Sequence, residues 1–275
     1  MRSGTLNSVA SSLYSLPASP VPAQARGAAM TRVGNDTWPE GGFVRQLPDA
    51  DRAALLDAGT PVRFEDDQIL LIQGDAADYL YVLTGGLVKV IVTAVSGAQT
   101  TLAIRSRGDL VGEFALLDDK PRTATARAAG PVSALKIGGA AFLAITGRSP
   151  TAQAAVTKYL MAKMRATTER RAAERVWDAR ERLAQVLFEL GEQYGQPDAD
   201  GMIRIPLTQS ELGDLAGVAV STAERVLKDL RRQGAVSTRY REITIRDMAY
   251  LEGIRFSTEK SENPLHAGIC RALIR

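Results

Sequence analysis

The sequence predicts an α+β protein with a strand-rich first part, a long helix and a small helical C-terminal part. Three observations support this. Between residues 62 and 137, short apolar runs alternate with glycine and aspartate turns, which is typical of antiparallel strands. From 140 to 191 the apolar residues recur with a helical period. Residues 207–236 read as two short helices joined at Gly217.

Composition excludes several classes of protein. With 45% apolar and 24% charged residues over 275 positions, the chain can bury a core and is not disordered as a whole. The single cysteine (Cys270) and single histidine (His266) cannot build a zinc site, an iron-sulfur cluster or a histidine-based triad. We therefore expect no bound metal and no enzyme. No apolar run reaches membrane-spanning length, so we expect a protein of the reducing cytoplasm.

The strand-rich part begins after two shorter segments. Residues 1–42 are rich in Ser, Ala, Pro and Gly, which predicts a disordered extension. A short helix is expected between Phe43 and Leu56, with Pro48-Asp49 as its start signal and Leu47, Leu55 and Leu56 as candidate buried positions. The strand runs are QILLIQGD, YLYVLTGGLVKVIVTAV, TTLAIRSRGDLVGEF and VSALKI, and tight turns are expected at Gly74-Asp75, Gly85-Gly86, Gly97 and Gly108-Asp109. They predict an antiparallel barrel or sandwich.

The helical region predicts one helix of about 35 residues, about 50 Å long. Val156, Leu160, Met164 and Thr167 fall on one narrow stripe of it, flanked by charges. Such a stripe favours a partner helix from a second subunit. The alternative is a long helix that packs on its own strand domain.

Residues 207–236 predict a helix-turn-helix. Thr208 and Glu211 are expected to form a capping box, and Ser221 is expected to cap the second helix. Spacing predicts a buried face of Ala223, Val226, Leu227 and Leu230. The candidate DNA-binding residues are Thr208, Gln209, Ser210, Val220, Ser221, Thr222, Glu224, Arg225 and Lys228.

Charge supports nucleic acid as the partner. Seven basic residues stand against two acids between Arg225 and Arg246, although the net charge of the chain is only +3. STRYREITIRD then predicts a β-hairpin, the wing that contacts the sugar-phosphate backbone in winged helices. The alternative is a helical hairpin with a solvated basic face.

GEFALLDDKPRTATARA, residues 112–128, places an acid and a base around a turn in a small, apolar segment. Arg122 beside Thr123, with two backbone amides, would make an anion site, and Glu113 could accept hydrogen bonds from a sugar hydroxyl. One phosphate and one ribose would satisfy this set. The alternative is an internal Glu113–Arg122 ion pair. The candidate residues are Gly112, Glu113, Phe114, Ala115, Arg122 and Thr123.

GEFALL followed by PRTATARA closely resembles the phosphate-binding cassette of cyclic-nucleotide-binding domains, and QGDAADYLYVLTGGLVKV resembles their β-roll. Residues 45 to 246 as a whole resemble the CRP/FNR family. The resemblance implies a cyclic-nucleotide-binding β-roll (43–150), a dimerisation helix and hinge (151–190) and a winged helix-turn-helix (191–248). It offers no counterpart for a tail at 249–275.

The resemblance also implies roles for the residues. Glu113 would hold the ribose hydroxyl, Arg122 and Thr123 the cyclic phosphate, and Thr167 with Thr168 of the partner subunit the adenine base. The alternative for both threonines is a hydrogen bond back to the preceding helical turn.

On this basis we expect a homodimer that binds a palindromic double-stranded DNA operator under the control of cyclic AMP and works with RNA polymerase. The same fold could answer to cyclic GMP or cyclic di-GMP, or act without ligand. A more distant alternative is a nucleotide-sensing module that controls a partner protein.

The start of the second helix departs from the family pattern. Family members that respond to cyclic AMP carry a base-reading Arg and Glu where this chain has Val220 and Ser221. Arg225 is retained. The sequence therefore does not predict the family's usual half-site.

Overall fold

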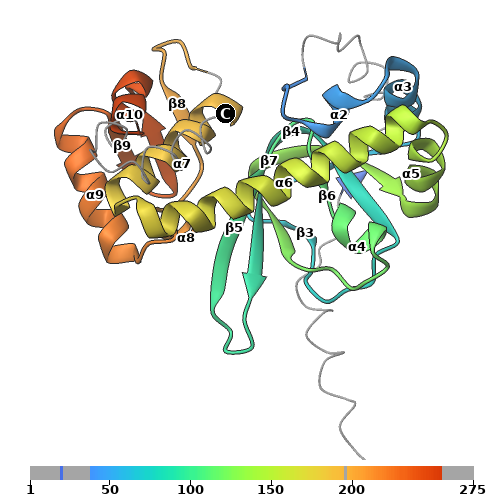
Figure 1. Ribbon diagram of the computed structural model, residues 1–275, viewed down its shortest axis with the longest axis horizontal. Helices are drawn as coiled ribbons and strands as arrows, with labels where there is room; N and C mark the ends of the chain where they lie inside the picture. The colour runs from blue at the N-terminus through green and yellow to red at the C-terminus, as the bar shows by residue number, and fades with distance from the viewer. Residues whose placement is uncertain (1–18, 21–37, 195–196, 256–275) are drawn as a thin grey trace, which may run out of the picture. The chain divides into compact units, whose positions relative to one another are not determined.

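The computed structural model describes residues 19–20, 38–194 and 197–255. The chain forms two compact units: the first comprises the chain up to Gln99 together with Ala103–Ala155, and the second comprises Thr100–Leu102 together with the chain from Val156 onward. Figure 1 colours the first unit blue to yellow-green and the second yellow to red. Most of the expected extension (1–42), the end of the expected tail, His266 and Cys270 lie outside the described residues. Within these residues, no helix is long and apolar enough to span a bilayer.

The first unit is built on an antiparallel sheet, as the alternating runs predict. The strand order is β1-β2-β7-β4-β5, with β3 paired to β7 and β6 to β4. The strands are β1 (Ser19–Pro20), β2 (Thr60–Phe64), β3 (Ile69–Leu71), β4 (Tyr79–Thr93), β5 (Gln99–Arg105), β6 (Leu110–Val111) and β7 (Thr125–Gly138). β4 and β7 are long and pair along most of their length.

The strands of this unit contribute side chains to one hydrophobic core. Its buried members include Phe64, Leu71, Tyr81, Leu83 and Val88. Gly74, Gly97 and Gly108 adopt positive φ in turns, as expected. Gly85-Gly86 is a correction, because the register between β4 and β7 shifts on both sides of Gly85. The pair is a bulge within one strand and not a turn between two.

Helices precede the main strands of this unit, interrupt them once and follow them along the chain. They are α2 (Phe43–Gln46), α3 (Asp49–Asp57), α4 (Glu113–Leu117), α5 (Gly139–Thr146) and the start of α6 (Pro150–Val176). The single helix expected between Phe43 and Leu56 is therefore two helices, and Pro48 is the N-cap of the second. Leu47 and Leu55 are buried as expected, whereas Leu56 is partly exposed.

The second unit combines helices with a small sheet of order β8-β10-β9. Beyond α6 it contains α7 (Ala179–Tyr194), β8 (Ile203–Ile205), α8 (Gln209–Ala216), α9 (Val220–Arg232), β9 (Val236–Arg239), β10 (Glu242–Ile245) and α10 (Met248–Arg255). α7 contacts α8, α9 and α10. No element was expected from residue 249 onward, but α10 buries Leu251 and Ile254.

The single long helix expected between 140 and 191 is wrong, because the chain forms α5, α6 and α7 there. Pro150 opens α6, a position where its missing N–H costs nothing. Asp178 caps α7, since its Oδ1 accepts hydrogen bonds from the backbone N–H of Arg180 and Glu181 at 2.7 and 2.9 Å. In return, the backbone N–H of Asp178 donates to Oε2 of Glu181 at 2.8 Å. Asp178 and Glu181 thus form a capping box that starts a new helix. The helical spacing of apolar residues continues across this point, so it does not indicate the break.

Candidate functional site

The cassette segment forms one cluster in the first unit. β6 leads into Gly112, whose φ of 96° lies in the left-handed region, and α4 follows directly. Arg122 is 4% exposed. Its Nη1 donates to the carbonyl oxygen of Gly112 at 2.6 Å, and its Nη2 donates to the carbonyl oxygen of Tyr79. The guanidinium is thus fixed against the turn that opens the cassette.

The other expected cassette residues differ in exposure. Glu113 and Ala115 are buried, while Phe114 and Thr123 are exposed and Gly112 is partly exposed. A Cβ at position 112 would lie 2.7 Å from both Nη1 of Arg122 and Cδ1 of Leu71. The turn therefore accepts only glycine, both for its φ and for its closeness to the guanidinium.

Tyr79 is a member of this cluster that sequence reasoning missed. Its carbonyl binds Arg122, and its ring lies 5.2 Å from the guanidinium carbon and 3.8 Å from Nζ of Lys136. The ring also makes an edge contact with Tyr81, whose pKa is raised mainly by burial. The bond joins Arg122 to a backbone carbonyl 43 positions away. Every residue type has such a carbonyl, so no sequence motif indicates the contact.

Thr167 and Thr168 are exposed on α6, in the second unit. Their hydroxyls donate to the carbonyl oxygens of Lys163 and Met164 at 3.0 and 3.1 Å. The hydrogen bond back to the preceding turn, expected as the alternative, is therefore present. A hydroxyl whose proton is used this way still offers its oxygen as an acceptor.

The residues of the expected stripe on α6 differ in exposure. Val156 and Leu160 are partly exposed, whereas Met164 is 60% exposed. Met161, which the expected stripe did not include, is 56% exposed. Tyr159 on the same helix is fully buried.

The helix-turn-helix is present in the second unit as α8 and α9. The N–H of Glu211 donates to Oγ1 of Thr208 at 3.1 Å and the N–H of Thr208 to Oε2 of Glu211 at 2.8 Å, which completes the expected capping box. Gly217 ends α8 in the left-handed conformation, with φ 62°. The expected buried face of α9 is confirmed at Ala223, Val226, Leu227 and Leu230.

The expected cap of α9 is wrong. The helix begins at Val220, its N-cap is Ala219, and no side chain caps it. Ser221 instead lies in the first turn with its side chain exposed, where it is available to a partner. The other candidate DNA-binding residues are exposed (Ser210, Val220, Glu224, Arg225, Lys228) or partly exposed (Thr208, Gln209, Thr222).

Ion pairs neutralise some of the basic residues near α9. Arg232 pairs with Asp229 at 3.3 Å. Arg204 on β8 pairs with Asp198 at 2.9 Å and with Glu242 at 3.8 Å. The backbone N–H of Met202 and the Arg204 guanidinium together hold the pKa of Asp198 below its usual value. Asp229 and Glu242 are the two acids already counted between Arg225 and Arg246, and these pairs show which arginines they face.

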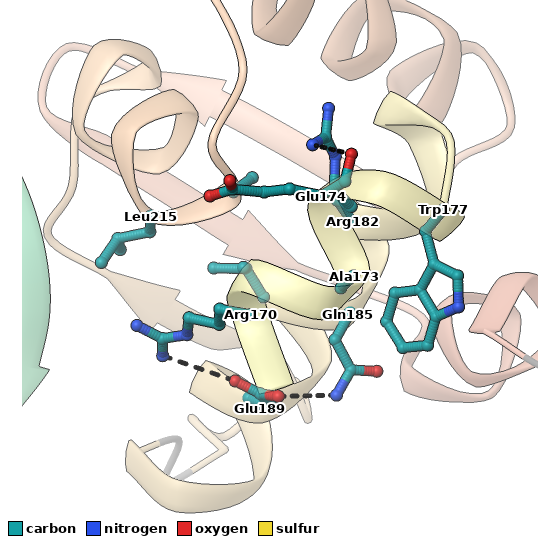
Figure 2. A pocket seen from close by; sticks show the side chains of 10 residues that line it. Arg170, Ala173, Glu174, Trp177, Arg182, Gln185, Glu189 and Leu215 are labelled. Atoms are coloured by element: carbon teal, nitrogen blue, oxygen red, sulfur yellow. Dashed lines mark hydrogen bonds and ion pairs between the residues drawn. The ribbon is translucent and has the colours of Figure 1, made fainter. Parts of the chain in front are cut away.

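A hollow lies where α6, α7 and α8 meet (Figure 2), and both apolar and charged side chains line it. Arg170 pairs with Glu189 at 3.6 Å across the α6–α7 junction, and Nη1 of Arg182 donates to the carbonyl oxygen of Glu174 at 3.3 Å. Trp177 packs on Ala173 at the end of α6. The hollow carries both signs of charge. In the described part of the chain, no cluster of side chains is arranged to hold a metal ion.

Comparisons with known proteins agree with this architecture. The model of the cyclic nucleotide-binding domain matches residues 61–149, and that of the Crp-like helix-turn-helix domain matches residues 181–254. A cyclic AMP receptor protein from Thermus thermophilus is 30% identical over 187 residues, which cover 68% of this chain and 84% of that protein.

Two further matches cover a similar share. A CRP-like cAMP-activated global transcriptional regulator from Mycobacterium tuberculosis is 27% identical over 71% of this chain and 88% of its own length. The crystal structure of a CRP-family transcriptional regulator from Thermus thermophilus is 28% identical, has a TM-score of 0.58, and covers 71% of this chain and 96% of that one. The chain therefore belongs to the CRP family of DNA-binding transcription regulators and contains a cyclic nucleotide-binding domain.

Proposed function

We propose that the protein is a homodimer whose affinity for a palindromic operator is controlled by cyclic AMP. The observation that carries the proposal is the buried Arg122, fixed by the carbonyl oxygens of Gly112 and Tyr79 beside the exposed Thr123. Its partners in these bonds are dipoles, which only partly offset a buried cation. A cyclic phosphate would supply a full negative charge at this point.

The ligand-binding roles follow from chemistry. The Arg122 guanidinium has more N–H donors than its two carbonyl bonds use, so it can also bind phosphate oxygens. The Thr123 hydroxyl would donate to the same phosphate, and Glu113 would accept from the ribose hydroxyl. Gly112, Phe114 and Ala115 would form the wall of the site through their backbone.

The threonine hydroxyls favour adenine over guanine as the base. Each hydroxyl proton is directed to a helix carbonyl, so each oxygen presents lone pairs. The 6-amino group of adenine can donate to such an oxygen, whereas guanine has a carbonyl oxygen at that position. We infer that Thr167 and Thr168 of the partner subunit contact the adenine amino group.

In the second unit, α9 would read the major groove. Val220, Ser221, Thr222, Glu224, Arg225 and Lys228 would face the DNA from α9, and Thr208, Gln209 and Ser210 would contact its backbone from the start of α8. A dimer places two such helices on the two halves of a palindrome. The protein would act in the cytoplasm with RNA polymerase as a further partner. It would regulate transcription by binding and would catalyse no reaction.

The test is calorimetric titration of the purified protein with cyclic AMP, cyclic GMP and cyclic di-GMP, followed by DNA binding with and without the best ligand. We expect cyclic AMP to bind tightest and to raise DNA affinity. Tighter binding of another nucleotide would replace cyclic AMP in the proposal. Binding of none would reject the cassette as a ligand site.

Coupling between ligand and DNA is tested separately, because binding energies at two sites must be reciprocal. Operator DNA should tighten cyclic AMP binding by the same factor as cyclic AMP tightens DNA binding, with a coupling of about 1 to 3 kcal/mol. Replacing Thr167 and Thr168 with alanine should reduce this factor more than it reduces nucleotide affinity. Equal nucleotide affinity with and without operator in the wild type would reject control by ligand, even if both sites bind.

A further inference from the structure

The ring of Tyr79 lies against two cations beside the cassette segment. The guanidinium carbon of Arg122 is 5.2 Å from the ring centroid, and Nζ of Lys136 is 3.8 Å from it. Both distances lie within the range of about 6 Å over which the face of an aromatic ring attracts a cation. The carbonyl oxygen of Tyr79 also accepts a hydrogen bond from Nη2 of Arg122. One residue therefore contacts the buried arginine with both its backbone and its side chain.

A row of aromatic rings connects Tyr79 to the hydrophobic core. Tyr79 meets Tyr81 in an edge contact, with ring centroids 5.4 Å apart and planes at 75°. Tyr81 meets Phe64 in the same way, at 5.4 Å and 88°. Phe64 and Tyr81 are buried members of the core, and the partly buried Tyr79 packs against it. Because close-packed core side chains have little freedom to move, the row holds the outermost ring in one place.

The ring holds the guanidinium without using any of its hydrogen-bond donors. A guanidinium has five N–H donors in one plane, and two of those in Arg122 donate to the carbonyl oxygens of Gly112 and Tyr79. A carboxylate in place of the ring would bind further donors and offset the positive charge. An aromatic face attracts the cation through its electrons alone. The remaining donors of Arg122 thus stay available to a phosphate.

We propose that Tyr79 is a positioning residue of the nucleotide site: its ring, anchored to the core, keeps the Arg122 guanidinium in the orientation that binds the phosphate. Tyr79 lies outside the cassette segment (112–128), so affinity for the ligand depends on a side chain that the segment does not contain. The inference rests on the proposed role of Arg122 as the phosphate ligand. It does not require the nucleotide to control DNA binding.

The test measures binding of the nucleotide that the wild type binds tightest among cyclic AMP, cyclic GMP and cyclic di-GMP. Tyr79→Leu keeps the backbone carbonyl and an apolar side chain but removes the aromatic face. It should lower the affinity about three- to thirtyfold, the range expected for loss of a partly desolvated cation–π contact. Tyr79→Phe keeps the aromatic face, so its affinity should stay within about twofold of the wild type.

Lys136→Met is the matched control, because it removes the other cation from the same ring. Lys136 is exposed, and water and salt screen its charge. Its loss should therefore change the affinity at physiological salt by less than about twofold. Thermal unfolding of every variant separates loss of the site from loss of the fold.

A spectroscopic signal tests the position of the ring independently of affinity. In the empty site the ring of Tyr79 lies beside a guanidinium that carries its full charge, and a bound phosphate would offset that charge. Nucleotide binding should therefore change the ultraviolet absorption of tyrosine in the wild type. In Tyr79→Phe this change should be lost, although the nucleotide still binds.

Four outcomes would overturn the inference and leave the proposed function intact. They are wild-type affinity in a folded Tyr79→Leu protein, equal losses in Tyr79→Leu and Tyr79→Phe, an equal loss in Lys136→Met, and a tyrosine signal that is unchanged in Tyr79→Phe. A wild-type protein that binds none of the three nucleotides would instead reject the proposed function, and this inference with it.

Discussion

Arg122 binds two backbone carbonyls of its own unit as well as the proposed ligand, so its removal affects both folding and binding. Arg122→Ala should abolish nucleotide binding. It should also lower the free energy of unfolding of the first unit by about 1 to 3 kcal/mol, because two partly buried backbone carbonyls lose their donor. Calorimetric titration and thermal unfolding measure the two effects. Full nucleotide affinity in a folded Arg122→Ala protein would contradict the assigned role.

A substitution at Gly112 tests whether the position of the Arg122 guanidinium matters, without removing the guanidinium. In Gly112→Ala the new methyl group would lie 2.7 Å from Nη1 of Arg122, so the guanidinium must move. Nucleotide affinity should fall at least tenfold. Gly97→Ala is the matched control, because Gly97 also has a positive φ but has open space around it. The control should lose about 1 kcal/mol of stability from backbone strain and keep its nucleotide affinity.

At the scale of elements, the break between α6 and α7 depends on a single capping residue. Asp178→Ala removes the acceptor for two backbone N–H groups and should cost about 0.5 to 2 kcal/mol of stability in the second unit. Asp178→Asn retains an acceptor oxygen and should lose only part of this. Denaturant unfolding measures the difference. Equal stability of the alanine variant and the wild type would mean that packing at the junction, around Trp177 and Ala173, sets the break alone.

The exposed part of α6 carries two apolar side chains, and their exposure to water is unfavourable. Met161 and Met164 are three residues apart and more than half exposed, so they lie on one face of the helix. If a second subunit covers this face, Met161→Lys with Met164→Lys should shift the protein toward monomer, which sedimentation measures. Ala166→Lys adds a positive charge at an exposed position on the opposite side of the same helix and serves as a control that should leave the oligomeric state unchanged. A dimer of unchanged affinity in the double variant would place the interface elsewhere.

For the whole molecule, the sequence predicts those features that depend on local residue patterns. The strand runs, the capping box at Thr208 and the buried face of α9 follow from period and spacing, and the structure confirms them. The sequence assigns Ser221 as a cap because its residue type suits one, yet the N-cap is Ala219, two residues earlier. The α6–α7 break was missed because the apolar period crosses it, although Asp178 and Glu181 carry its capping pattern. Tyr79 was missed because its contact is made by the backbone.

β7 pairs with β2, β3 and β4, although it is the last strand of its sheet in the chain. During synthesis from the N-terminus, these three strands emerge before their shared partner exists. They must wait with unpaired edges, which is the condition that favours association with other nascent chains. The cassette segment (112–128) runs into β7 at Thr125, so the proposed nucleotide site can take its final form only when the sheet closes. A nascent chain that stalls before Thr125 would therefore lack the strand that pairs with β2, β3 and β4.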